Sequence, residues 1–266
     1  MHTMTSPTRA AAHVERMPAV RVLARVGLAA IGILHILIGV IALAVAFGSG
    51  GNADQRGALQ AVVAVPGGLF ALWAVIVGLV FLSLWQILQA FTAHGAGEKV
   101  IEVVKCVVYA ALAVIAVSIA LGGRSNSSSS EKSSSAKLLA MPGGVFLLAA
   151  IGVIIVVVGV VFIVNGVTHR FERDLRLPPN RWAYITTTLG RIGYVAKGIA
   201  LIIVGGLVVF GAITSDPSKA GGLDGSLKAL TKVPFGVFLL ILIALGLIAY
   251  GAFWCVRAYA SRLKEP

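Results

Sequence analysis

Six uninterrupted apolar stretches limit what this chain can fold into more than any other feature of its sequence. A helix needs about 20 residues, each adding about 1.5 Å, to cross the hydrocarbon core of a bilayer. Each stretch reaches that length, so we predict an all-α polytopic membrane protein with six transmembrane helices. The stretches lie at residues 22–47, 66–91, 101–121, 142–166, 192–213 and 234–256.

The composition excludes a soluble domain, a disordered tail and a fibrous protein. Hydrophobic residues make up 58% of the chain and charged residues 12%, with a mean hydropathy of +0.96, whereas a soluble domain is roughly 45–50% apolar and about 25% charged. The net charge is +12, but most basic residues flank the apolar stretches. This placement is a signal of membrane topology, and we expect no nucleic-acid partner.

Internal repetition divides the chain into three copies of a two-helix unit. The motif P-x-G-x-F opens the second, fourth and sixth stretches at Pro66, Pro142 and Pro234. The pattern R-x-G-x4-G-x6-G begins at Arg25 and again at Arg191. We therefore predict a polar basic tail over 1–20, followed by repeats at 21–93, 98–169 and 187–260.

The middle repeat is the most divergent copy. It keeps Lys99 in the column of Arg25 and Lys105 in the column of Lys197, but it has Cys106 where the outer copies have glycine. Each repeat contains an even number of crossings, so the three copies share one orientation, and a pseudo-threefold axis along the membrane normal should relate them. A proline suits the first turn of a helix, so P-x-G-x-F predicts a helix start at one membrane face.

With three P-x-G-x-F hairpins and an R-x-G start on the odd helices, the sequence resembles a family of triple-repeat membrane proteins found mainly in actinobacteria. This family is known as domain of unknown function 1206. The resemblance extends over nearly all of the chain beyond the tail. It implies a fold and a membrane location, and it supplies no functional residues to transfer.

The distribution of basic residues predicts the orientation in the membrane. Placing both termini on one side collects 15 Lys and Arg residues there and leaves 7 on the other. By the positive-inside rule, both termini of this multi-pass plasma-membrane protein should face the cytoplasm. The arginines at 170, 173, 176 and 181 would attract anionic lipid headgroups at that face, although an ordinary orientation signal also explains them.

His35 is the one ionisable side chain near the middle of the first stretch, and an intramembrane ionisable residue is a site hypothesis by default. Three interpretations remain open: a neutral histidine bonded to a neighbouring helix, a group facing a substrate, and a haem or quinone ligand. A bis-histidine haem needs a second histidine at matching depth, and Tyr109 and Leu201 occupy this column in the other repeats.

Gln89, Asn165 and Arg257 share one column near the inner headgroup level, 23 residues after their prolines. They either cap the helices at the interface or converge into a ring that binds an anionic headgroup or gates a path. Lys105 and Lys197 are expected to be interfacial anchors, with Glu102 as the partner of Lys105.

Glycines recur every seven residues, as expected for close packing of membrane helices. Such a stripe either holds the six-helix bundle together or docks another membrane protein. The stripes comprise Gly32 and Gly39, Gly198 and Gly205, and Gly152, Gly159 and Gly166.

The segments between the helices should be short exposed loops, including the serine runs 127–130 and 133–135. The sequence has no GxxxxGK[ST], GxGxxG, HExxH or GxSxG motif. We therefore expect no enzymatic activity, no catalytic residue, no metal and no cofactor.

Three functions stay open at this point. The first is a non-enzymatic accessory protein that acts on lipid or on a membrane-protein partner. The second is a small uncoupled transporter or channel with a path along the pseudo-threefold axis, and the third is a haem- or quinone-binding redox protein.

Overall fold

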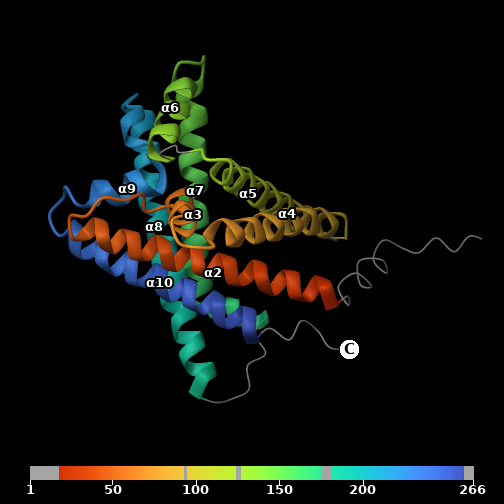
Figure 1. The fold of residues 1–266 in the computed structure, drawn as a ribbon. Coiled ribbons are helices and arrows are strands. Elements are labelled where there is room, and N and C mark those ends of the chain that lie inside the picture. Colours follow the sequence, from red (N-terminus) through yellow and green to blue (C-terminus); the bar gives the residue numbers. More distant parts are fainter. Residues whose placement is uncertain (1–17, 93–94, 124–126, 175–180, 261–266) are drawn as a thin grey trace, which may run out of the picture.

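A computed structural model describes residues 18–92, 95–123, 127–174 and 181–260, and within these ranges the chain is built from helices without strands (Figure 1). Residues 1–17 of the predicted tail lie outside the described part. The six long helices are α2 (Pro18–Ala46), α4 (Gly68–Thr92), α5 (Ala96–Ala120), α7 (Gly144–Val167), α8 (Arg181–Ile213) and α10 (Gly236–Ala260). The short ones are α3 (Gln55–Val63), α6 (Ser127–Leu139), α9 (Gly222–Leu230), η1 (Arg170–Asp174) and η2 (Pro217–Lys219).

The long helices confirm the predicted class of protein. All six are long and apolar enough to cross a membrane, so the chain is a multi-pass membrane protein. Their limits lie within five residues of the expected stretches, except that α8 begins eleven residues early, at Arg181.

The long helices associate as three pairs, and each pair joins two repeats. The most extensive packing is between α4 and α5, between α7 and α8, and between α10 and α2. The second helix of every repeat therefore packs on the first helix of the next repeat, and α10 closes the cycle on α2. This closed order is what a pseudo-threefold relation requires.

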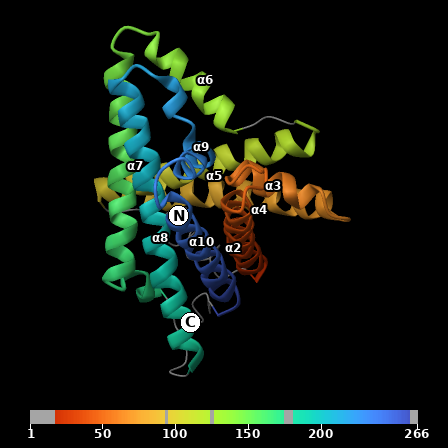
Figure 2. The ribbon, with the colours of Figure 1, turned by 90° about the vertical axis from the view of Figure 1, so that its left-hand side faces the viewer.

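The three pairs are not packed equally against one another. Helix α8 packs closely on α10, which joins the α7/α8 pair to the α10/α2 pair, whereas α5 and α7 of the middle repeat make little or no contact. Figures 1 and 2 show the pairs running in clearly different directions. The described helices thus form a splayed set of pairs in which the middle repeat is the most open.

Small residues at equivalent positions bring the helices of each pair together. A Cβ on Gly198 would lie 2.6 Å from the carbonyl oxygen of Gly159, and one on Gly32 would lie 2.7 Å from that of Gly251. In the middle repeat, the Ser83 hydroxyl donates to the Cys106 carbonyl at 3.2 Å. These are the same columns of the repeat: Gly32 with Gly251, Gly198 with Gly159, and Cys106 with Ser83.

The glycine stripes therefore pack against other helices of the same chain. A Cβ on six of the seven stripe glycines would collide with another helix of the same molecule, and one on Gly166 would lie 3.0 Å from the Cβ of Tyr194. This packing leaves none of them as an open face for a second membrane protein, so the intramolecular interpretation of the stripes is the correct one.

The prediction of short exposed loops was wrong, because each inter-helix segment at one end of the molecule contains a helix. We call α3, α6 and α9 the cap; they contribute one helix per repeat, and α6 packs on α9. The serine-rich segment forms α6, which packs on α7 and α9 and buries Ser128 and Ser135. Tertiary packing here overrides the weak helix propensity of serine.

The P-x-G-x-F motif is a tight reversal between a cap helix and a spanning helix, so its proline precedes the helix instead of occupying the first turn. The residue after each proline has a positive φ: 76° at Gly67, 76° at Gly143 and 59° at Phe235. A Cβ on the following glycine would collide with a carbonyl oxygen of the cap helix or its end. The colliding pairs are Gly68 with Val62, Gly144 with Leu138 and Gly236 with Leu230.

Candidate functional site

The feature with the clearest chemical content is a cavity of about 490 Å³ between α2, α7, α8 and α10, which the cap helices cover at one end. On α8 its lining residues are Lys197, Ala200, Leu201, Val204 and Val208. These positions follow one face of the helix over about 16 Å, because eleven residues rise about 1.5 Å each. The cavity is therefore elongated along α8, and most of its wall is aliphatic.

His35 and Lys197 meet at the end of the cavity farther from the cap. The Nδ1 atom of His35 lies 2.8 Å from the carbonyl oxygen of Ile31, one turn earlier in α2. A carbonyl only accepts, so Nδ1 carries the proton and Nε2 is left as an acceptor. Lys197 Nζ donates to Nε2 across 3.0 Å, joining α8 to α2.

Two aromatic rings complete the surroundings of the lysine. Lys197 Nζ lies 4.4 Å from the ring centroid of Tyr250 and 4.9 Å from that of Phe162, both within the range of cation–π attraction. The Tyr250 ring also contacts the His35 ring edge-on at 4.8 Å. Phe162 comes from α7 and Tyr250 from α10, so residues of three other helices, with His35 of α2, contact the lysine.

Lys197 has no carboxylate partner among the described residues. The four ion pairs in that part of the chain are Lys105–Glu102, His169–Glu172, Lys219–Asp216 and Lys228–Asp224. Buried charges in proteins are normally paired. Lys197 is thus half-buried in the wall of the cavity, with a histidine and two aromatic rings around Nζ.

The opposite end of the cavity lies under the cap and is polar. It is lined by Gln55, Ser130, Glu131 and Ser134. Burial, together with the nearby carboxylates of Asp54 and Asp224, raises the pKa of the Glu131 carboxyl to about 7, against a smaller lowering by Arg56. Glu131 therefore changes charge near neutral pH at the cap end of the cavity.

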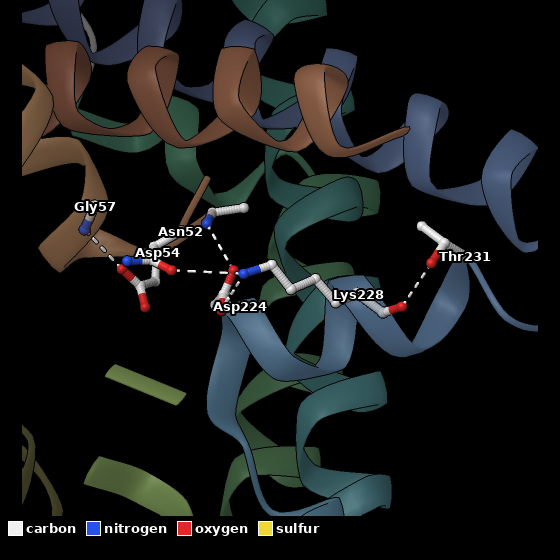
Figure 3. Close-up of polar contacts among 7 residues, drawn as sticks. Asn52, Asp54, Gly57, Asp224, Lys228 and Thr231 are labelled. Carbon is white, nitrogen blue, oxygen red and sulfur yellow. Dashed lines mark hydrogen bonds and ion pairs between the residues drawn. The ribbon is translucent and has the colours of Figure 1, made fainter. Parts of the chain in front are cut away.

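A hydrogen-bonded network centred on Asp224 joins α3 to α9 beside this end (Figure 3). Asp224 is 1% exposed and accepts from the backbone N–H of Ala53 and from Lys228 Nζ, each at 2.9 Å. Asp54 is the N-cap of α3 and accepts from the Gly57 N–H at 2.8 Å. The network fixes the first turn of α3 against α9.

The other predicted candidates lie apart from the cavity. Gln89, Asn165 and Arg257 are half-buried near the ends of α4, α7 and α10, which belong to three different helix pairs, and none of them lines the cavity. The Arg257 guanidinium stacks on Trp254 with its carbon 4.8 Å from the ring centroid. In the predicted basic cluster, Arg176 lies outside the described residues.

Sequence reasoning missed the role of Lys197. Lys105 has its predicted partner, because its Nζ lies 2.7 Å from Glu102. Lys197 instead lines the cavity. One difference between the two lysines is visible in the sequence. Three residues before the lysine, the middle repeat has Glu102 and the third repeat has Tyr194. The chain thus supplies a carboxylate beside one lysine of this column, whereas the ring of Tyr194 packs on Phe162 and Tyr250.

The described residues do not favour a metal or haem centre. No group of three or more His, Cys, Asp or Glu side chains among them is arranged to hold a metal ion. Both ring nitrogens of His35 are already engaged, by Ile31 and by Lys197. A haem iron would have to displace the lysine to gain this histidine as a ligand.

Comparison with known proteins finds the same three repeats. The family model described as Domain of Unknown Function (DUF1206) matches residues 26–93, 103–169 and 192–261. The chain is 31% identical over 249 residues to "Uncharacterized protein YxxB" of Bacillus subtilis (strain 168), and the alignment covers 90% of each chain. No solved structure matches it.

Proposed function

The chain belongs to the DUF1206 family, and from that premise we propose that it is a non-enzymatic membrane protein that binds a small, largely apolar molecule in the cavity along α8. The observation that carries the proposal is the cavity itself. Its volume of about 490 Å³ falls within the roughly 300–1,000 Å³ typical of small-molecule sites. Aliphatic walls with polar groups at the two ends are the usual construction of such sites.

We place the protein in the plasma membrane with both termini in the cytoplasm and the cap on the outer side. The excess of basic residues at the end opposite the cap, 15 against 7, supports this orientation. A ligand in the cavity would then lie in the outer part of the membrane, between the His35–Lys197 pair and the cap.

The wall of the cavity suggests how the ligand enters. Ile151 of α7 lines the cavity and is 39% exposed, and α7 makes little or no contact with α5. We propose entry from the lipid past this side of α7. A lipid-soluble molecule would reach the cavity without crossing water.

Photolabelling tests the proposed function. The purified full chain is placed in phosphatidylcholine nanodiscs with a diazirine-bearing fatty acid or the matching fatty alcohol, irradiated, and its labelled peptides are mapped. We expect labelling by at least one probe to concentrate on residues 148–155 and 197–208. Labelling spread evenly over all six spanning helices would refute the proposal.

A matched pair of variants sharpens this experiment. Leu201→Trp introduces a larger side chain into the lining, whereas Leu207→Trp makes the same change at a half-buried position of α8 outside the lining. Cavity labelling should fall several-fold in Leu201→Trp and stay unchanged in Leu207→Trp. Equal labelling in both variants would contradict the proposal.

Transport remains the alternative function for the same cavity. The observation that favours it is that His35, near the middle of α2, lines the cavity. Flux of the labelled compound across reconstituted vesicles, abolished by Leu201→Trp, would make the protein a carrier. Binding without flux would leave it a lipid-interacting or accessory protein.

A further inference from the structure

Resting on the proposed function, we infer that the ligand of the cavity carries an anionic head group on a hydrocarbon chain, with the head bound to Lys197 Nζ and the chain lying along α8 toward the cap. A fatty acid has this chemistry, and so does an acidic phospholipid that inserts one chain. The inference concerns the charge and the direction of the ligand, and four observations carry it.

The first observation is the unused donor capacity of Lys197. An ammonium group has three N–H donors, of which His35 Nε2 accepts one at 3.0 Å. Among the described residues, Nζ otherwise lies over the rings of Tyr250 and Phe162, which attract a cation but accept no conventional hydrogen bond. A carboxylate or phosphate oxygen in the cavity would take the remaining donors.

The second observation is the comparison with the equivalent lysine of the middle repeat. Lys105 pairs with Glu102 at 2.7 Å and is exposed beside it. In the third repeat Tyr194 replaces the glutamate, so Lys197 has no such partner in its own helix. A buried charge in a protein is normally paired with an opposite charge. A bound head group would supply the anion that the helix of Lys197 lacks.

The third observation sets the direction of the ligand. The cap end of the lining contains Glu131, with Asp54 and Asp224 close enough to raise its pKa. Those carboxylates repel an anion, whereas Lys197 attracts one. The head group therefore belongs at the His35–Lys197 end.

The fourth observation is the shape of the wall between the two ends. The α8 face from Lys197 to Val208 extends about 16 Å, and Ile38, Leu201 and Val204 line it with aliphatic groups. An elongated, mainly aliphatic cavity with one basic end is complementary to a hydrocarbon chain with one acidic end. A compact polar solute would leave that wall without apolar contacts.

Equilibrium dialysis of the full chain in phosphatidylcholine nanodiscs tests this inference, with empty discs subtracted. The probes are isotopically labelled dodecanoate and dodecanol, which share a chain and differ in charge. We expect dodecanoate to bind about 10- to 100-fold more tightly than dodecanol, the range expected for hydrogen bonds to a charged group. Lys197→Met should remove this preference.

Lys105→Met is the matched control, because it removes a lysine from the same column outside the cavity, and it should leave dodecanoate affinity unchanged. Equal affinity for acid and alcohol would overturn the inference while leaving the proposed function intact. Absence of binding by both probes, together with even photolabelling, would overturn both. The comparison of acid with alcohol uses the unaltered chain, so it holds even if Lys197→Met fails to fold.

A second arm of the experiment distinguishes the two sources of the anion. Phosphatidylglycerol is added to the discs while dodecanoate is titrated. If it abolishes dodecanoate binding in the wild type, the anionic site is supported and its occupant is an acidic phospholipid. If dodecanoate binding persists, the site is supported as one for a free fatty acid.

Discussion

Asp224 offers the sharpest test of how the cap is held together. Its two contacts differ in kind: the Ala53 N–H is completely buried, whereas the Lys228 side chain is 39% exposed. In Asp224→Ala the Ala53 N–H loses its acceptor, and an unsatisfied buried donor costs about 1–3 kcal/mol. Loss of the partly exposed ion pair adds up to about 1 kcal/mol.

The expected loss of local stability in Asp224→Ala is therefore about 1–4 kcal/mol. Asp224→Asn should cost at most about 1 kcal/mol, because its amide oxygen still accepts from Ala53 while the ion pair is lost. Hydrogen–deuterium exchange of residues 53–58 measures the difference. Every 1.4 kcal/mol is about tenfold in the opening equilibrium, so exchange should accelerate by roughly 5- to 700-fold in the alanine variant.

Two controls make this prediction refutable. Asp216→Ala removes an exposed aspartate from the same end of the molecule and should leave exchange at 53–58 unchanged. Peptides from α7 should also keep their protection in Asp224→Ala, because the effect is local to the cap. If the alanine and asparagine variants exchange alike, the reasoning about the buried N–H is wrong.

Three further predictions concern packing, pH and surface charge. Gly198→Val forces a side chain against the Gly159 carbonyl and should destabilise the α7/α8 pair by about 1–3 kcal/mol or more in detergent unfolding. Gly206→Val is the control, because a Cβ at Gly206 meets nothing within 4 Å, and it should not destabilise the pair. Equal losses of stability in the two variants would contradict the packing argument. Because the pKa of Glu131 is raised from 4.5 to about 7, the folded cap keeps a proton that the unfolded chain has lost, so cap stability should fall as pH rises through that window. Glu131→Gln should flatten this dependence of cap exchange between pH 5 and 8, and an unchanged slope would refute the assignment. Lys105→Met breaks an exposed pair and should change the melting temperature little; a large drop would mean that the pair is structural.

The class of fold and its repeats could be predicted from the sequence because both depend on the order of residues along the chain and not on contacts between distant segments. Lipid requires a long apolar run for every crossing, so six runs give six helices. The P-x-G-x-F motif predicted that a helix starts nearby, but its local geometry depended on a contact. The glycine at 144 is needed because the backbone of Leu138 approaches it, and the sequence does not record that approach.

Part of the site was also visible in the sequence. His35 stood out because ionisable groups are rare inside apolar stretches. Its partner did not, because Lys197 lies 162 residues later and has the spacing of an ordinary interfacial anchor. Gln89, Asn165 and Arg257 share a column, but they lie near the ends of helices from three different pairs, and none of them lines the cavity.

The sequence alone determined that this chain crosses a membrane six times in three related units, because hydrophobic length and repetition need no knowledge of neighbours. The tertiary structure decided which helices pair, that a serine-rich segment folds into a cap helix, and that a cavity ends on Lys197. In a membrane the faces that meet lipid and the faces that meet protein are equally apolar. Hydrophobicity therefore distinguishes a membrane-spanning helix from a loop. Only the tertiary structure, in which glycines pack against the backbone of neighbouring helices, shows which spanning helices are in contact and where a cavity remains between them.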